Sequence, residues 1–208
     1  MAIKNIIIDL GGVIINLDHQ RQALAFKKLG VEKFDVLYAQ NSQENIFDDF
    51  EKGIITAVQF RNFFRRFINL PVSDQQIDTA WNQILLDVPK ERMELLRSLS
   101  NRYRLFLLSN TNIIHIPVFT NIIETAHGKG AFTNVFEKIY YSCFMKIRKP
   151  DIEIFKTVID ENNLELSETI FIDDGPQHIA GARTAGLTSY LLEKNQTLNE
   201  LFIQIFTK

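Results

Sequence analysis

Cysteine and long apolar segments are almost absent from this chain. Cys143 is the only cysteine in 208 residues, which excludes an internal disulfide and a zinc site made of several thiolates. No apolar run reaches the length needed to span a bilayer, and the N-terminal run of isoleucines is too short for a signal peptide. We therefore expect a cytoplasmic protein that neither enters a membrane nor depends on disulfides.

An excess of charge of either sign is also missing. The chain has 23 Lys and Arg residues against 25 Asp and Glu residues, for a net charge of -2. Proteins that bind nucleic acid or anionic membranes usually carry a strongly basic surface, so neither partner is expected here. The length suits one core domain with an insertion of moderate size, and the composition gives no indication of the oligomeric state.

One stretch near the N-terminus joins an apolar run to a single carboxylate. Three isoleucines, residues 6–8, precede Asp9 directly, and Gly11 and Gly12 follow it closely. Such a run is typical of a strand in the middle of a parallel sheet, and Asp9 then lies at its carboxyl end, where open α/β sheets bind ligands. The glycines allow a tight turn and a close approach of the backbone to a ligand. Asp9 is thus a nucleophile or metal ligand, or merely a cap of the next turn.

The next segment of the chain has helical periodicity and no convincing strand. Its phenylalanines recur at helical spacing, and we interpret them as core residues. We expect helices at about residues 19–29, 31–39, 43–52, 56–67 and 71–85. Together they predict a helical cap domain, residues 16–86, inserted into a core domain made of residues 1–15 and 87–208.

Strands and helices alternate in the remainder of the chain. Helices are expected at residues 90–100, 152–162 and 177–185, and strands at 103–108, 138–142, 169–172 and 188–192. The stretch around Pro117 is expected to be irregular. Alternating strands and helices form βαβ units, which predicts an α/β fold with a three-layer, Rossmann-like parallel sheet core.

Polar side chains recur where these strands end. They are Asp9, Ser109, Asn110, Lys149, Asp173 and Asp174. Because the carboxyl ends of parallel strands lie at one edge of a sheet, we expect these groups to converge. Three carboxylates in one site repel one another and need a cation, and a set of oxygen ligands selects Mg²⁺, which often shares its coordination with a substrate phosphate.

The same set of residues suits the transfer of a phosphoryl group. The hydroxyl of Ser109 and the amides that start the next helix can bind phosphate oxygens, and Lys149 adds a positive charge for the phosphate or for Asp9. Asp9 is then free to attack phosphorus. The charges could instead form a buried ion-pair network without a function, but such clusters are costly and contribute little to stability.

This order of motifs resembles the haloacid dehalogenase-like superfamily of hydrolases. Residues 8–13 (IDLGGV), 107–111 (LLSNT), 148–151 (RKPD) and 171–174 (FIDD) are similar to its four motifs, and the helical insertion is placed like its C1 cap. The chain most resembles the subgroup that contains α-glucose-1-phosphate phosphatase and the phosphatase domain of soluble epoxide hydrolase.

The resemblance implies a Mg²⁺-dependent phosphatase of small phosphorylated metabolites. Asp9 would be the nucleophile and a magnesium ligand, with the backbone carbonyl of Gly11 and the carboxylate of Asp174 as further ligands and Asp173 assisting through water. It also implies that Lys149 steadies the charge, and that Ser109 and Asn110 bind the phosphoryl group. From their position after Asp9, Gly11 and Gly12 are further candidates for substrate binding.

The chain departs from most such phosphatases at Gly11, where a second aspartate usually serves as general acid and base. Positioned proton transfer is typically worth 10²–10⁴-fold in rate, so the substrate could carry a leaving group that needs little protonation, such as a sugar 1-phosphate or an acyl phosphate. A cap residue or a bound water could instead supply the proton, with Asp18 and His19 as candidates. Lys146 and His178 stand where relatives often have Gly and Asn.

Two other functions remain open from the sequence. A metal-independent haloacid dehalogenase would use the same nucleophile on carbon, but it has no need of the pair Asp173 and Asp174. A catalytically silent relative would bind phosphorylated ligands or a protein without turnover.

Several further residues have simpler interpretations. No two histidines show metal-ligand spacing, so we expect His115, His127 and His178 to be surface or packing residues. The acidic residues Asp48, Asp49 and Glu51 could meet the substrate from the cap, but a solvated helix face is the simpler interpretation, as it is for the arginines within 61–66.

Overall fold

A parallel five-stranded sheet forms the centre of the computed structural model, which describes residues 2–32, 34 and 46–207. The strand order is β3-β2-β1-β4-β5. The strands are β1 (Asn5–Ile8), β2 (Arg104–Ser109), β3 (Lys138–Tyr141), β4 (Thr169–Asp173) and β5 (Thr188–Leu191). Every strand pairs with its neighbours in parallel, which confirms the predicted α/β fold.

The first strand lies at the centre of the sheet, as its apolar run predicts. Ile8 pairs with Leu107 of β2 on one side and with Ile172 of β4 on the other. Because successive side chains of a strand point to opposite faces, Ile6 and Ile8 join one apolar cluster and Ile7 joins another. The strand that carries Asp9 is therefore held on both faces and both edges.

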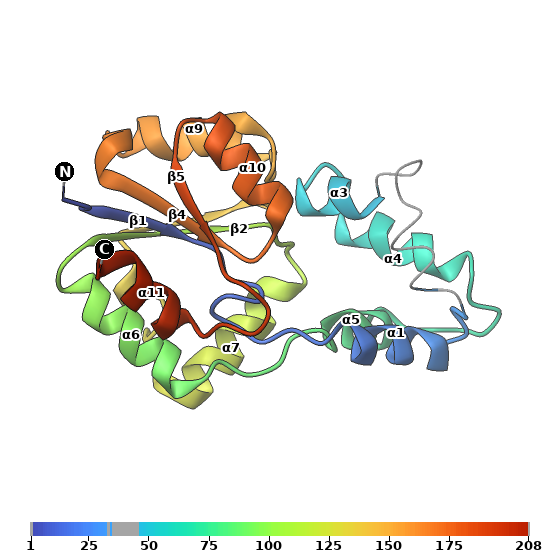
Figure 1. Cartoon of the computed structure of the whole chain (residues 1–208). Coiled ribbons are helices and arrows are strands. Elements are labelled where there is room, and N and C mark those ends of the chain that lie inside the picture. The colour runs from blue at the N-terminus through green and yellow to red at the C-terminus, as the bar shows by residue number, and fades with distance from the viewer. Residues whose placement is uncertain (1, 33, 35–45, 208) are drawn as a thin grey trace.

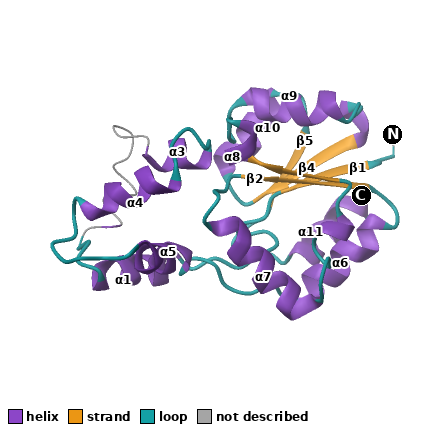
Figure 2. Ribbon diagram, turned by 180° about the vertical axis from the view of Figure 1, so that it is seen from behind, coloured by secondary structure: helices purple, strands orange, loops and turns teal. Residues whose placement is uncertain are grey.

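Helices cover both faces of the sheet (Figures 1 and 2). Helices α9 (Ile152–Glu161) and α10 (Pro176–Thr184) pack on one face. Helices α6 (Lys90–Ser100), α7 (His115–His127) and α11 (Leu198–Phe206) pack on the other. Three short elements complete this part, namely α8 (Ser142–Met145), η1 (Thr133–Val135) and η2 (Leu166–Glu168).

A group of helices lies beyond the carboxyl ends of the strands (Figure 1), and we call it the cap. Its helices in the described residues are α1 (His19–Lys28), α3 (Ile46–Glu51), α4 (Ala57–Arg65) and α5 (Asp74–Asn82). The cap has an apolar core of its own, in which Phe60 stacks on Phe50 with ring centroids 4.0 Å apart. We propose residues 16–86 as its limits.

Side-chain caps and ion pairs fix the ends and faces of the cap helices. Thr56 and Ser73 each form a reciprocal capping box at the start of α4 and α5. Arg61 of α4 binds Asp78 of α5 through two hydrogen bonds of 2.8 and 2.7 Å. The expectation of a solvated arginine face is therefore wrong for Arg61, whose side chain is largely buried in this pair.

Two helices of the core differ from expectation. The stretch around Pro117 is helical rather than irregular, because Pro117 lies in the first turn of α7, where a backbone N–H has no partner within the helix. Helix α11 was not expected at all, although Thr197 and Glu200 form a capping box at its start.

The helix expected at 31–39 lies almost wholly outside the described residues, and α3 is described only from Ile46. No helix in the described part of the chain is both long and apolar enough to cross a membrane.

Candidate active site

The strand ends bring the predicted polar groups to one edge of the sheet. Asp9 follows β1, Ser109 ends β2, and Asp173 ends β4. Since β1 lies between β2 and β4, these three side chains come from adjacent strands. Lys149 approaches from the loop between α8 and α9. Groups that lie far apart in the sequence thus share one site.

Lys149 is the centre of this site. Its fully buried ammonium lies 2.6 Å from Oδ1 of Asp9 and 2.6 Å from Oδ2 of Asp173. Asn110 fixes the backbone that carries the lysine: its Nδ2 donates to the Lys149 carbonyl at 2.9 Å, and its Oδ1 accepts from the Lys149 N–H at 2.9 Å. The amide oxygen and one N–H of Asn110 are therefore occupied in positioning Lys149, while the second N–H of the amide takes no part in these two bonds.

Burial and charge pull the pKa values of these groups in different directions. Burial raises the pKa of Asp9 to about 7, against the opposing effect of Lys149. Although burial acts against the charged form of Asp173 as well, Lys149 and His178 lower the pKa of this carboxyl. Burial also disfavours the ammonium of Lys149, but Asp173 and Asp9 outweigh it and raise its pKa. Lys149 and Asp173 thus form a charged pair beside a carboxyl that holds its proton more tightly than usual.

Three carboxylates gather closely enough to share a cation. One oxygen each of Asp9, Asp173 and Asp174 lie within 4.8 Å of one another. Both oxygens of Asp173 already have partners, because Oδ2 binds Lys149 and Oδ1 accepts from the N–H of Gly175 at 2.7 Å and contacts Nδ1 of His178 at 2.8 Å. Asp9 and the exposed Asp174 are therefore better placed than Asp173 to ligate a metal directly.

Gly12 makes room for Asp174. A Cβ atom at Gly12 would lie 2.0 Å from Oδ2 of Asp174, and the φ angle of Gly12 is +71°. Its N–H is used within the turn, where it donates to the carbonyl oxygen of Ile15 at 2.9 Å. Glycine is thus needed at this position so that the carboxylate of Asp174 can approach the turn. The N–H of Gly12 is not directed at a ligand.

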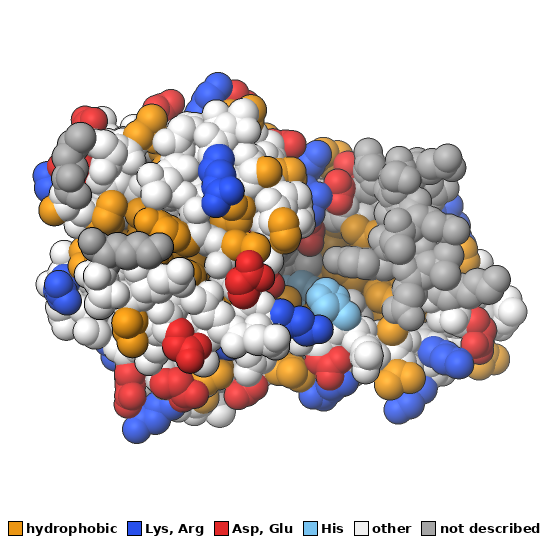
Figure 3. Space-filling view, viewed as in Figure 1, with side chains coloured by type: hydrophobic (Ala, Val, Ile, Leu, Met, Phe, Trp, Pro, Cys, Tyr) orange, Lys and Arg blue, Asp and Glu red, His pale blue; other side chains and the backbone are white. Residues whose placement is uncertain are grey.

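A small cavity of about 130 Å³ is lined by Leu10 and Gly11, the two residues that follow Asp9, and by Ser109 of the neighbouring strand, whereas the three aspartates themselves are not among its lining residues. It lies where the cap meets the core, and the space-filling view shows a hollow at this junction with a histidine side chain beside it (Figure 3). Core and cap residues both line it: Leu10, Gly11, Ile15, Leu17, His19, Gln22, Glu51, Trp81, Ile84, Leu85, Ser109, Asn110, Thr111, His115 and Phe119. The hydroxyl of Ser109 has one weak contact of 3.5 Å, which leaves it available to a ligand.

One end of the cap is attached to the loop that carries Lys149. Arg148 binds Asp48 at 2.8 Å and Glu51 at 2.9 Å, and Nζ of Lys146 donates to the carbonyl oxygen of Gly53 at 2.7 Å. The expectation that the acidic residues of α3 form a solvated face is wrong for Glu51, which is half-buried and lines the cavity. Burial raises the pKa of Glu51, against the opposing effect of Arg148.

Sequence reasoning missed the roles of two histidines. His178 contacts Asp173, and His115 lies in the cavity wall. The position of His115, six residues after Ser109 and at the start of the next helix, was a usable signal. Of the two candidate proton donors, His19 lines the cavity, whereas Asp18 accepts a hydrogen bond of 3.0 Å from the N–H of Arg21 and caps α1.

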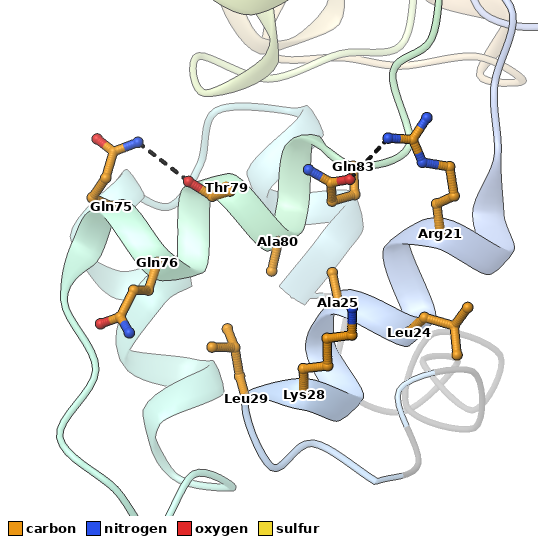
Figure 4. Close-up of a pocket in the computed structure, with 10 residues that line it drawn as sticks. All are labelled: Arg21, Leu24, Ala25, Lys28, Leu29, Gln75, Gln76, Thr79, Ala80 and Gln83. Atoms are coloured by element: carbon orange, nitrogen blue, oxygen red, sulfur yellow. Dashed lines mark hydrogen bonds between the residues drawn. The ribbon is translucent and has the colours of Figure 1, made fainter.

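A second and larger hollow of about 540 Å³ lies between α1 and α5 of the cap (Figure 4). Arg21 and Gln83 bridge the two helices at one end, and Gln75 bonds to Thr79 along α5. None of the described residues that line this hollow has a carboxylate, so within the described part of the chain it lacks the acidic groups that mark the site at the sheet edge.

Comparisons with known proteins agree with this geometry. A sequence model of the haloacid dehalogenase-like hydrolases matches residues 3–186. The D-ribitol-5-phosphate phosphatase of Bacteroides thetaiotaomicron is 29% identical over 188 residues, which cover 90% of this chain and 91% of that protein. This match supports the superfamily, but it does not show the narrower glucose-1-phosphate phosphatase subgroup that the sequence predicts.

Solved structures of high similarity come from the same superfamily. A HAD family enzyme of B. thetaiotaomicron, in complex with magnesium and inorganic phosphate, has a TM-score of 0.84 and 38% identity, over 97% of this chain and 100% of that one. A HAD-like family hydrolase from Porphyromonas gingivalis has a TM-score of 0.87 and 30% identity, over 100% of both chains. The chain therefore belongs to the haloacid dehalogenase-like hydrolases.

Proposed function

We propose that this hydrolase is a Mg²⁺-dependent phosphomonoesterase of small phosphorylated metabolites, with Asp9 as its nucleophile. The observation that carries the proposal is the convergence of Asp9, Asp173 and Asp174 within 4.8 Å, beside the buried Lys149. The cavity next to these groups has room for the remainder of a small substrate. The phosphatase among the relatives, and the magnesium and phosphate in a similar structure, support the same chemistry.

The residues of this site fit a magnesium ion. Hard oxygen ligands with an excess of negative charge are what Mg²⁺ requires, and three carboxylates face a single ammonium here. Asp9, Asp174 and the backbone carbonyl of Gly11 would hold the ion, and Asp173 would assist through water, since both of its oxygens have protein partners. When bound, the ion would neutralise the phosphate and orient it toward Asp9.

Asp9 would act by covalent catalysis. One of its carboxylate oxygens forms a bond to phosphorus while the bond from phosphorus to the leaving oxygen breaks, and the leaving oxygen takes up a proton. Water then attacks phosphorus of the aspartyl-phosphate, which frees Asp9 and releases inorganic phosphate. Lys149 holds Oδ1 of Asp9 through a hydrogen bond of 2.6 Å and so fixes the direction of the nucleophile.

Glu51 is the residue that we assign as proton donor to the leaving oxygen, in place of the carboxylate missing at Gly11. It lines the cavity together with Gly11 and Ser109. Burial raises the pKa of its carboxyl, which favours the protonated form that a general acid needs. The acid would thus come from the cap.

We propose a sugar or polyol phosphate as the substrate. The cavity of about 130 Å³ is below the roughly 300–1,000 Å³ of pockets for drug-sized ligands, and the named relative acts on ribitol 5-phosphate. If Glu51 protonates the leaving oxygen, the enzyme can hydrolyse a primary ester such as a 5-phosphate. A preference for sugar 1-phosphates would instead indicate that the enzyme uses leaving groups that need little protonation. A small metabolite and a balanced charge also agree with a cytoplasmic enzyme.

A screen of phosphorylated metabolites, with and without Mg²⁺ and beside Asp9→Asn, tests the proposal. We expect release of phosphate that EDTA abolishes, and a loss of at least about a thousandfold in kcat for Asp9→Asn. Activity that resists EDTA and releases halide from a 2-haloacid would establish a dehalogenase instead. Binding of phosphorylated ligands without turnover, unchanged in Asp9→Asn, would establish a silent relative.

A further inference from the structure

We infer that His115 selects substrates by a hydroxyl group: its Nε2 atom accepts a hydrogen bond from the leaving group in the cavity beside Asp9. This inference rests on the proposed function and adds a specificity residue to it. His115 is the first residue of α7, and its side chain is buried at the junction of core and cap, with 9% of the residue exposed. It shares the cavity wall with Gly11 and Ser109.

The hydrogen-bond network determines which ring nitrogen of His115 carries the proton. Nδ1 lies 2.8 Å from Oδ1 of Asn82. The orientation of this amide is fixed, because Nδ2 of Asn82 donates to the carbonyl oxygen of Asp78 at 2.8 Å. Oδ1 can only accept, so Nδ1 of His115 is the donor, and Nε2 of the neutral ring keeps its lone pair.

That lone pair has no protein donor in the described part of the chain. The buried side-chain nitrogen and oxygen atoms that lack a partner there are Asn112 Nδ2 and Arg148 Nε. The imidazole ring of His115 makes its hydrogen bond through Nδ1, so Nε2 has no partner among the described residues. Because Nε2 is nevertheless not one of the buried unpaired atoms, it is accessible from the cavity that the ring lines. Burial lowers the pKa of His115 to about 3, and Nε2 therefore remains an acceptor at neutral pH.

The ring is held rigidly in this orientation. It stacks on Trp81 of the cap with centroids 5.0 Å apart and an angle of 6° between the rings. Asn112 also accepts hydrogen bonds from the N–H groups of Ile114 and His115, at 3.1 and 3.0 Å, which fixes the start of α7. A ligand hydroxyl would thus meet a preorganised acceptor, for which little conformational freedom remains to be lost.

The rest of the cavity wall gives this acceptor its selectivity. Leu10, Ile15, Leu17, Ile84, Leu85 and Phe119 form the apolar part of the wall, which polar side chains such as Gln22 and Thr111 complete. A leaving group that bears a hydroxyl would satisfy Nε2, whereas a hydrocarbon leaving group of the same length would cover it and leave it unpaired. Sites built to bind a hydroxyl reject analogues that lack it strongly for this reason.

The test compares matched phosphate esters with and without hydroxyl groups. The probes are ribitol 5-phosphate against pentyl phosphate, and glycerol 3-phosphate against propyl phosphate, each assayed with wild type and with His115→Phe. Phenylalanine keeps a ring on Trp81 but has no acceptor. We expect wild type to prefer the hydroxylated member of a pair, and His115→Phe to reduce this ratio of kcat/KM by about 10- to 100-fold.

Two further measurements make the result decisive. The inhibition constant of inorganic phosphate should be equal in wild type and His115→Phe, because the phosphoryl site itself is intact. If wild type shows no preference for hydroxylated esters, the inference fails whether or not the variant folds; an unchanged ratio in a folded His115→Phe overturns it as well. Failure of the proposed function looks different, since wild type would then hydrolyse none of the four esters.

Discussion

Nζ of Lys149 lies 2.6 Å from Oδ1 of Asp9, in a site where the lysine side chain has no exposed surface. The same ammonium binds Asp173, so Lys149→Met leaves two buried carboxylates without their cation. Removing one partner of a buried ion pair costs about 3–5 kcal/mol. We therefore expect the free energy of unfolding of Lys149→Met, measured with urea in the presence of EDTA, to fall by an amount of that size.

Lys138→Met is the matched control, because the ion pair of Lys138 with Glu161 is exposed. Exposed pairs contribute little, so its unfolding curve should nearly coincide with that of wild type. Equal losses in the two variants would show that Lys149 does not hold the acidic groups together.

Gly12→Ala should weaken magnesium binding. Its Cβ would lie 2.0 Å from Oδ2 of Asp174, so the carboxylate must move away from the other acidic groups. Gly30→Ala imposes a similar backbone strain, since φ of Gly30 is +100°, but the new Cβ meets nothing within 4 Å. Calorimetric titration with Mg²⁺ should show weaker binding for Gly12→Ala alone, whereas weakening in both variants would point to general destabilisation.

Glu51→Gln should slow the hydrolysis of esters with poor leaving groups. If Glu51 protonates the leaving oxygen, its loss costs about 10²–10⁴-fold in kcat on an alkyl phosphate, but much less on p-nitrophenyl phosphate, whose leaving group needs no proton. Asp48→Asn is the control, because Asp48 also binds Arg148 but does not line the cavity. A similar loss on both esters, or in both variants, would remove Glu51 from this role.

His115 should make the fold sensitive to mild acid. Burial lowers its pKa from 6.5 to about 3, so below pH 6.5 the unfolded chain takes up a proton that the folded protein does not. The free energy of unfolding then falls by up to about 1.4 kcal/mol per pH unit. The free energy of unfolding of His115→Phe, measured with urea and compared with that of wild type, should therefore be about 2 kcal/mol more favourable to the variant at pH 5 than at pH 7. The same difference between the two proteins at both pH values would contradict this assignment.

The parallel sheet could be predicted closely from the sequence because its strands carry uniform apolar runs. Residues 6–8 and 169–172 are buried on both faces, and the turns that follow them contain the polar groups of the site. Helix α11 was missed although Thr197 marks its start, since a short helix after the last strand has no required place in a βαβ pattern. Pro117 misled the interpretation of α7, because proline is unfavourable inside a helix but harmless in its first turn.

The strand ends of the candidate site could also be anticipated, whereas the cavity at the junction of core and cap could not. Asp9, Ser109 and Asp173 are brought together by strand order, which topology alone dictates. Glu51 of the cap and His115 of the core share one cavity wall only because the cap packs on the core. That packing depends on single contacts such as the stacking of Trp81 on His115, for which the sequence contains no periodic signal.

Trp81 is the only tryptophan of the chain. It belongs to the cap, and its indole stacks at 5.0 Å on a histidine of the core. When the protein is excited at the red edge of tryptophan absorption, where its five tyrosines absorb little, the emission therefore comes from a single chromophore at the boundary between the two parts. Any swing of the cap during turnover would change the surroundings of that indole, so the emission of the unlabelled protein offers a stopped-flow record of opening and closing.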